Sequence, residues 1–312
     1  MELMLMVKKD VLSILDVKEE LLVLLENARE IKAGQKKGEQ YMPLAGKTLG
    51  MIFEKSSTRT RISFEVGMTQ LGGHAIYMNP KDMQMGRGET TADTAKVLSR
   101  YCDAIVYRAF KHDMMKELAE NATVPVINAL DDREHPCQIM ADLLTVIEHK
   151  GDDFGKLKMS YVGDGNNVCN SLLLGCAVVG MNMTAACPKG YWPNEEILTE
   201  AKKIGKRMGA KIEIVEDPMV GVEYADVIYT DVWVSMGDEK EEATRLKAFK
   251  PFQVNDALVA TAKRDAIIMH CLPAHRGLEI AASVMDGPQS VVFDEAENRL
   301  HAQKALLVQV IK

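Results

Sequence analysis

The sequence predicts an α/β protein with two doubly wound parallel-sheet domains. From residue 48 onward, short apolar runs alternate with segments of helical periodicity, which is typical of parallel sheets covered by helices on both faces. The 312 residues fit two domains of about 150 better than one. Internal repeats and long Gly/Ser/Pro linkers are absent, which argues against a repeat architecture. We expect interdomain helices to link the domains, with the active site in the cleft between them.

The expected elements follow in chain order. Residues 11–34 have apolar positions at helical spacing and end in Gly34, which predicts two short helices or one broken helix. A helix over 136–151 connects the halves, and residues 295–312 predict a terminal helix. The apolar runs expected as strands are 48–54, 74–78, 103–108, 124–130, 158–163, 183–187, 211–215, 226–232, 266–272 and 290–294.

Composition narrows the class of protein. Hydrophobic residues make up 47% of the chain and charged residues 27%, as in ordinary soluble proteins. The net charge of −7 argues against a general nucleic-acid binder, which would show a basic face. A local concentration of arginines in an acidic chain therefore suggests a small anionic ligand.

Targeting and cysteine patterns indicate a reduced, cytoplasmic protein. The longest apolar run, 172–181, is too short to span a bilayer, and the first residues lack a signal-peptide cleavage site. The six cysteines form no CxxC pair, so neither a disulfide framework nor a zinc site is indicated.

Polar side chains follow the strands of both halves at their carboxyl ends, where open α/β sheets bind ligands. In the first half these are Ser57, Thr58, Arg59, Thr60, Gln84, Arg108, His135 and Gln138. In the second half they are Asn167, Asp231, Ser235 and Cys271. Scattered surface polarity would not gather along these edges.

The segment SSTRT, residues 56–60, predicts an anion site. A helix beginning near Thr58 would present free backbone N–H groups beside hydroxyls and Arg59. The helix dipole contributes about 0.3–1 kcal/mol, whereas a charge-assisted hydrogen bond contributes about 1.5–3 kcal/mol. A helix cap with a solvated basic turn is the alternative, but a cap needs only one hydroxyl.

Two further first-half motifs have both plain and functional interpretations. Arg108 ends an apolar strand, where an arginine is either a surface charge or a second guanidinium for a phosphate. His135 precedes Pro136, an ordinary first helical residue. With Gln138 three positions later, His135 could also reach a carbonyl oxygen above the sheet edge.

The second-half motifs exclude some functions. GDGNNV, residues 163–168, resembles a dinucleotide fingerprint but has Val168 at the third glycine position and no later acidic residue for a ribose. Asp231 either caps a turn or contacts a polar substrate. His270 and Cys271 are adjacent on an expected strand, so we expect them to face opposite sides and not to share a metal ion.

Together these motifs resemble those of the ornithine carbamoyltransferases. FEKSSTRTR, the MQMG loop, VYR, HPCQ, GDGNN, DVWVSMG, HCLPAHRG and DEAENRLHAQK occur in family order along essentially the whole chain. The resemblance implies a two-domain transferase, usually trimeric, that makes citrulline and phosphate from carbamoyl phosphate and ornithine without metal or organic cofactor. It also implies a carbamoyl phosphate domain at 1–148, with helix 295–312 packing on it, and an ornithine domain at 149–294.

The resemblance further implies roles for single residues. Those assigned to carbamoyl phosphate are Ser57, Thr58, Arg59, Thr60, Gln84, Arg108, His135, Gln138, Cys271, Leu272 and Arg299, with Gln84 reaching a neighbouring subunit. Those assigned to ornithine are Asn167, Asp231, Ser235 and Met236. The catalytic set is Arg59, Arg108, His135, Asp231 and Cys271.

Other functions stay open at this stage. SMG and HCLP favour ornithine over aspartate as the acceptor, and Asp231 suits an ammonium group. The chain could instead carbamoylate putrescine or lysine, or be a catalytically silent binding subunit. A nucleotide-binding oxidoreductase is disfavoured by the failed fingerprint. Small-molecule substrates and self-association are expected, and nucleic acid and membrane are not.

Overall fold

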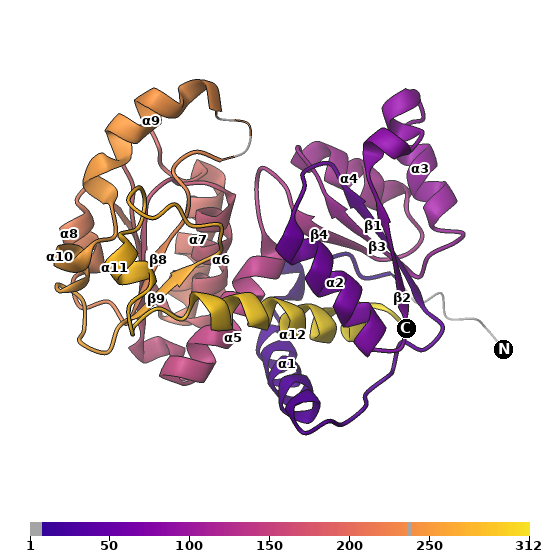
Figure 1. Ribbon diagram of the computed structural model, residues 1–312, viewed down its shortest axis with the longest axis horizontal. Helices are drawn as coiled ribbons and strands as arrows, with labels where there is room; N and C mark the ends of the chain where they lie inside the picture. The colour runs from indigo at the N-terminus through magenta and orange to yellow at the C-terminus, as the bar shows by residue number, and fades with distance from the viewer. Residues whose placement is uncertain (1–7, 236, 238) are drawn as a thin grey trace. The chain divides into compact units, whose positions relative to one another are not determined.

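The computed structural model describes residues 8–235, 237 and 239–312 in two compact units. Unit 1 comprises residues up to Cys137 together with Arg299–Lys312, and unit 2 comprises Gln138–Asn298. The divisions fall inside helices α5 (Pro136–Lys150) and α12 (Val292–Val310) (Figure 1). The expected boundaries after residues 148 and 294 fall in the same two helices.

Unit 1 contains a four-stranded parallel sheet in the order β2-β1-β3-β4. Its strands are β1 (Thr48–Phe53), β2 (His74–Met78), β3 (Ala104–Arg108) and β4 (Val126–Leu130). Its helical segments are η1 (Ile14–Val17), α1 (Leu21–Lys36), α2 (Thr58–Gln70), η2 (Pro80–Asp82), η3 (Met85–Arg87), α3 (Thr91–Leu98) and α4 (His112–Asn121). The inner strand β3 is buried along its whole length, whereas the edge strand β2 is partly exposed, as expected for a sheet covered on both faces.

Unit 2 contains a five-stranded parallel sheet in the order β7-β6-β5-β8-β9. Its strands are β5 (Lys158–Val162), β6 (Asn182–Ala186), β7 (Ile212–Val215), β8 (Val227–Thr230) and β9 (Ile267–His270). Its helical segments are η4 (Phe154–Lys156), α6 (Asn167–Val179), α7 (Glu195–Met208), α8 (Pro218–Val222), η5 (Glu239–Glu241), α9 (Glu242–Phe249), η6 (Lys250–Phe252), α10 (Asp256–Val259) and α11 (Ala282–Met285). Val162, Ile228 and Ile268 face a core that includes α8 and α10, while Tyr161 and Tyr229 stack on each other with ring centroids 6.1 Å apart.

The expected α/β class and parallel sheets are confirmed, but two details were wrong. Residues 290–294 do not form a strand: Ser290 makes a single bridge to Ile268, and α12 begins at Val292. A short apolar run fits a buried helix start as well as a strand. The N-terminal helix does not end at Gly34, because α1 continues to Lys36 after the short helix η1. Among the described residues, no helix combines the length and apolarity needed to cross a bilayer.

Candidate functional site

In unit 1, the predicted anion-binding residues lie where the strand order reverses. The chain goes outward from β1 to β2 on one side and from β3 to β4 on the other, so the switch point lies between β1 and β3, where α/β proteins bind ligands. Phe53 pairs with Arg108, and Arg108 pairs with Leu130 of β4. Residues that follow β1, β3 and β4 therefore start from one level of the sheet edge.

In the first turn of α2, only one of the hydroxyl groups caps the helix. Ser57 is the N-cap, and its hydroxyl accepts the Thr60 N–H at 3.2 Å. The Thr60 hydroxyl is buried and accepts a hydrogen bond from Arg299 Nη2 at 2.9 Å. Capping thus accounts for one hydroxyl only, as the sequence argument required, and it leaves the Thr58 hydroxyl and the Arg59 guanidinium beyond the cap.

The two arginines of the motif have different surroundings. The Arg61 guanidinium lies 3.8 Å from the centroid of the Tyr77 ring, and its Nε is 3.4 Å from Glu65. Arg61 also lines a cavity of about 800 Å³ on the β2 side of α2, together with Ser57 and Thr58. Arg59 instead acts electrostatically on His135.

His135 is the buried centre of a cationic group in unit 1. Its side chain is 4% exposed. Burial lowers its pKa well below the usual value, and the charges of Arg299, Arg108 and Arg59 lower this pKa further. The imidazole is therefore neutral at physiological pH and can donate one hydrogen bond without supplying a positive charge. Arg108 and Arg299 are also buried, so the structure groups four of the predicted residues.

Gln84 and Gln138 are the remaining predicted residues of the first half. Gln84 is exposed next to η3, after the edge strand β2. Gln138 belongs to unit 2, where its Nε2 donates to Asp142 Oδ1 at 2.8 Å and to Glu295 Oε1 at 2.9 Å. Both amide hydrogens of Gln138 are thereby used within unit 2.

Unit 2 places its predicted residues at the corresponding switch point, between β5 and β8. Asn166 caps α6, accepting the N–H groups of Val168 and Cys169, and its Nδ2 donates to Asp231 Oδ2 at 2.8 Å. Asn167 is the half-buried first residue of α6. Ser235 is half-buried in the loop after β8, and Met236 lies outside the described residues.

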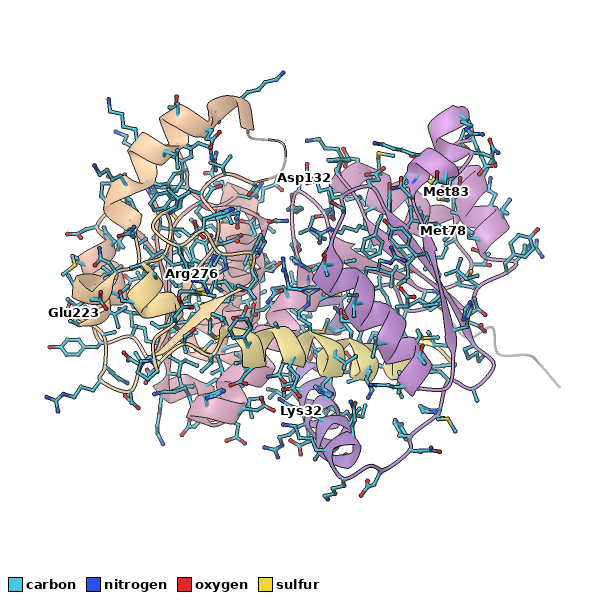
Figure 2. All side chains as sticks on the ribbon, in the orientation of Figure 1. Lys32, Met78, Met83, Asp132, Glu223 and Arg276 are labelled. Carbon is cyan, nitrogen blue, oxygen red and sulfur yellow. The ribbon has the colours of Figure 1, made fainter. Side chains whose placement is uncertain are left out.

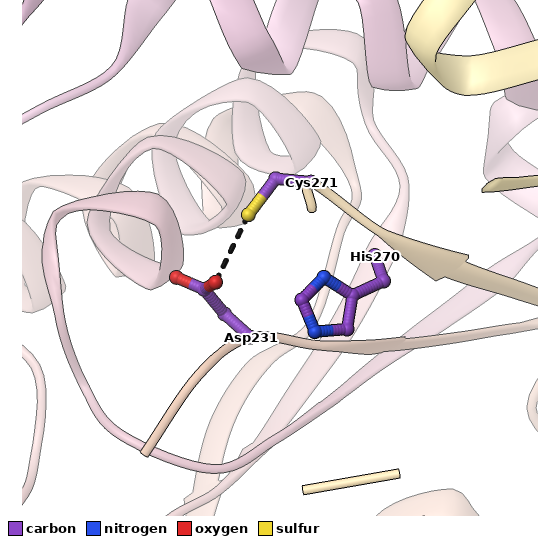
Figure 3. Close-up of side chains that lie close together, drawn as sticks. All are labelled: Asp231, His270 and Cys271. Atoms are coloured by element: carbon purple, nitrogen blue, oxygen red, sulfur yellow. Dashed lines mark hydrogen bonds between the residues drawn. The ribbon is translucent and has the colours of Figure 1, made fainter. Parts of the chain in front are cut away.

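Asp231 and Cys271 are joined across the ends of β8 and β9 (Figure 3). The Cys271 thiol donates to Asp231 Oδ1 at 3.0 Å. Burial raises the pKa of this thiol well above its usual value, and the negative charge of Asp231 raises it further. Cys271 is therefore a protonated hydrogen-bond donor and is not a base. Leu272, the next residue, has a positive φ of 58°, an uncommon conformation that clusters at functional sites.

The expectation that His270 and Cys271 face opposite sides was wrong. Ligand-type atoms of Asp231, His270 and Cys271 lie within 4.8 Å of one another, because β9 ends at His270 and strand alternation stops there. His270 Nδ1 accepts the Leu272 N–H at 2.9 Å, and Nε2 lies 3.2 Å from Glu279. Binding a metal ion would require a thiolate and the release of one of these ring contacts.

Sequence reasoning missed Asn166 and gave weight only to its neighbour. The signal was present, since Asn is a preferred N-cap after a strand, but the cap position depends on where α6 begins. The arginine of HCLPAHRG is not part of the cluster. Arg276, labelled in Figure 2, is exposed and pairs with Asp286 at 2.9 Å through its Nε.

Comparisons with known proteins point to one family. A family profile described as "Aspartate/ornithine carbamoyltransferase, carbamoyl-P binding domain" matches residues 9–148, and one described as "Aspartate/ornithine carbamoyltransferase, Asp/Orn binding domain" matches 155–310. The ornithine carbamoyltransferase of Methanosarcina acetivorans is 58% identical over 306 residues, covering 98% of this chain and all of that protein. A catabolic ornithine carbamoyltransferase of Thermoplasma acidophilum is 53% identical, with 98% and 99% covered.

A solved structure extends the likeness to the fold. Ornithine carbamoyltransferase from Pyrococcus furiosus matches with a TM-score of 0.94 and 52% identity, covering 97% of each chain. The two profiles together match most of the sequence, and the relatives match it from end to end. The chain therefore belongs to the aspartate/ornithine carbamoyltransferase family.

Proposed function

We propose that this protein transfers the carbamoyl group of carbamoyl phosphate to the δ-amine of L-ornithine, giving L-citrulline and phosphate. The observation that carries the proposal is the group of Arg59, Arg108 and Arg299 around a neutral His135 in unit 1. A dianionic phosphate needs more than one guanidinium, and a carbonyl oxygen needs a donor that keeps its proton.

In unit 1, each group has a distinct task toward carbamoyl phosphate. Ser57, Thr58, Arg59, Thr60 and Arg108 hold the phosphate at the start of α2 and the end of β3, where N–H groups and guanidiniums favour an anion. His135 and Arg299 donate to the carbonyl or bridging oxygen and stabilise the charge that develops there. Gln138, at the start of unit 2, is the further residue that we assign to the carbamoyl group.

In unit 2, the acceptor's two ends require different chemistry. Asn167, Ser235 and Met236 contact the α-amino acid end. Asp231 attracts the δ-ammonium, because an acidic side chain favours a cation. Cys271 and the Leu272 backbone orient the amine and the carbamoyl NH2. Because Cys271 already holds its proton, the amine proton goes to Asp231 or to the departing phosphate.

The energetics allow this reaction without a strong base. An amine with an ordinary pKa of about 10.4 is neutral in roughly one molecule in 2,500 at pH 7, a penalty of about 4.6 kcal/mol. Holding two reactants in the right orientation supplies about 7–11 kcal/mol. Positioning of the two substrates can therefore exceed the deprotonation penalty.

A panel of acceptors tests the assignment. Citrulline formation would be measured with carbamoyl phosphate and L-ornithine, and product formation with putrescine, L-lysine and L-aspartate in parallel. We expect ornithine to have the highest kcat/KM. A higher kcat/KM for putrescine or lysine would mean that this amine, and not ornithine, is the acceptor. If no amine gave a product, the protein would be a catalytically silent binding protein.

We also propose that the protein works as a homotrimer or a multiple of trimers, with Gln84 completing the site of a neighbouring subunit. The exposure of Gln84 supports this, as do Ile62 and Ile76, which are 53% and 43% exposed on α2 and β2. Light scattering after size-exclusion chromatography measures the assembly directly, and a monomer with full activity would overturn the proposal.

The cellular setting is part of the proposal. All six cysteines are free thiols, which suits the reducing cytoplasm. We place the reaction in arginine biosynthesis, and the Thermoplasma relative that is named catabolic makes the reverse direction the competing assignment. Rates measured from both sides at cellular substrate concentrations decide the direction.

A further inference from the structure

A cavity of about 890 Å³ in unit 1 is not used by the proposed reaction. It is lined by α1, the segment that follows it, the end of α2, and α12. Among its lining groups is Lys304 of α12, a lysine that is only 4% exposed. Buried lysines are rare unless they are paired, so the partners of this amine decide what it can do.

The Lys304 amine is held by two neutral acceptors. Its Nζ donates to Gln35 Oε1 on α1 at 2.7 Å and to Gln70 Oε1 on α2 at 2.9 Å. The lysine stem packs closely on α2, since a Cβ built at Gly67 would lie 3.3 Å from Lys304 Cγ. The amine is thus fixed by three helices of the same unit.

No described carboxylate compensates its charge. Glu20, Glu30 and Glu39 line the cavity, but within the described part of the chain none is in ion-pair distance of Lys304, and burial alone lowers the lysine pKa to about 8. Lys32, a second buried lysine on α1 (Figure 2), adds a positive charge to this unit and gives no compensation.

The two amide oxygens also suit the uncharged amine. A neutral amine keeps two N–H donors, and two acceptors are present. The third position carries a proton in the ammonium form and the nucleophilic lone pair in the amine form. Deprotonation therefore breaks neither hydrogen bond, and desolvation activates the nitrogen as it does in catalytic lysines.

We propose that Lys304 is a modification site, carbamoylated on Nζ by isocyanic acid that enters this cavity. The lysine nitrogen bonds to the carbon of HN=C=O, a C=N electron pair moves to the isocyanic acid nitrogen, and that nitrogen takes the proton lost by the amine. The product is a neutral urea, and no group leaves. The reagent is small and uncharged, so it suits a buried amine.

The proposed substrate supplies this reagent, and here the inference rests on the proposed function. In carbamoyl phosphate, loss of an N–H proton to a phosphate oxygen and cleavage of the C–O bond give isocyanic acid and phosphate. A protein that holds carbamoyl phosphate is therefore exposed to its breakdown product. Carbamoylation of Lys304 would leave Gln35 and Gln70 facing a bulkier, uncharged urea and would alter the contacts of α12 with α1 and α2.

The test measures labelling of the whole protein by potassium ¹³C-cyanate at pH 7, followed by digestion with a protease that does not cut at lysine and mass spectrometry. At pH 7, a pKa of about 8 leaves roughly one amine in eleven neutral, about 200-fold more than an ordinary lysine. Restricted access and lower basicity reduce that advantage. We expect Lys304 to react at least tenfold faster than Lys206, which is exposed on α7. An equal or slower rate would overturn the proposal.

The pH profile gives a second readout. As pH rises, neutral amine increases and isocyanic acid decreases, so their product stays level until the amine is fully deprotonated. For Lys304 the rate should be level to about pH 8 and then fall, while a free lysine derivative with an ordinary pKa of about 10.4 should hold its rate to higher pH. Coincident profiles would contradict the assignment.

Gln70→Glu is the matched variant, because it places a carboxylate where Lys304 now has a neutral oxygen. It should bring the Lys304 rate down to that of Lys206, and its melting temperature checks that it folds. An unchanged rate would mean that the neutral oxygens around Lys304 do not cause its reactivity.

Carbamoyl phosphate without ornithine, at a measured concentration of free cyanate, should give the same adduct, and its absence would remove the substrate as the source. Added ornithine should protect Lys304 by consuming carbamoyl phosphate. If cyanate labels Lys304 but ornithine gives no protection from carbamoyl phosphate, the proposed function has failed and the modification site stands. If cyanate itself does not label Lys304, the modification site has failed.

Discussion

Arg299 Nη2 donates a hydrogen bond to Thr60 Oγ1 at 2.9 Å, joining two residues that are 239 positions apart. Both are buried in unit 1. The contact connects the terminal helix α12 to the first turn of α2, where the proposed phosphate site begins. The Thr60 hydroxyl therefore orients the Arg299 guanidinium, and the positive charge of Arg299 contributes to the proposed phosphate site.

Replacing Thr60 by valine should test this contact, because valine keeps the shape and removes the acceptor. A buried guanidinium N–H then loses its partner, which costs about 1–3 kcal/mol. We expect a lower melting temperature and a KM for carbamoyl phosphate raised about tenfold or more, with little change in the KM for ornithine. Equal effects on both substrates would mean that the contact serves the fold alone.

Arg59→Ala should weaken carbamoyl phosphate binding far more than ornithine binding. Each lost charge-assisted hydrogen bond contributes about 1.5–3 kcal/mol, or roughly 10- to 150-fold in affinity. Calorimetry with each ligand separately measures the difference. Arg61→Ala is the matched control, since Arg61 lies over Tyr77 and beside Glu65; an equal loss in that variant would contradict the division of roles.

Turnover should rise between pH 6 and pH 9, because the fraction of neutral δ-amine increases roughly tenfold per unit below its pKa. The thiol of Cys271 is not the group that titrates, since its pKa is raised well above the usual range. Cys271→Ser should therefore lower kcat and leave the rising limb in place. A flat profile under chemistry-limited conditions, or loss of the limb in the serine variant, would refute this mechanism.

If Gln84 acts in a neighbouring subunit, two inactive variants should complement each other. Gln84→Ala and Arg108→Ala would each be prepared, dissociated, mixed and reassembled. Mixed trimers contain some sites in which both wild-type residues are present, so part of the activity should return. Reassembled single variants are the controls, and no recovery in the mixture would indicate that each subunit holds a complete site.

Much of the fold could be read from the sequence because β-branched apolar runs between turn residues are hard to place anywhere but in a sheet. The run at 290–294 was misassigned since its two valines can begin a buried helix equally well. Local strand alternation also failed at Cys271, because the pattern does not show where β9 ends.

Long-range contacts of the site were beyond the sequence for a different reason. Spacing predicts which residues share a sheet edge, but it does not predict that Arg299 reaches Thr60. Nor does it decide which asparagine, 166 or 167, caps α6 and meets Asp231. These depend on where helices begin and how they pack in each unit.

Gln303 offers a prediction about stability that is independent of function. Its side chain is fully buried on α12, and neither its Oε1 nor its Nε2 has a hydrogen-bond partner among the described residues. Gln303→Leu should raise the free energy of unfolding by about 1–3 kcal/mol, the desolvation penalty of an unsatisfied polar group. Asn298→Leu is the control, because that buried amide donates to Thr145 at 2.9 Å and to Glu148 at 2.8 Å. Chemical denaturation should show the control destabilised, and a destabilised Gln303→Leu variant would mean that the amide is satisfied in solution.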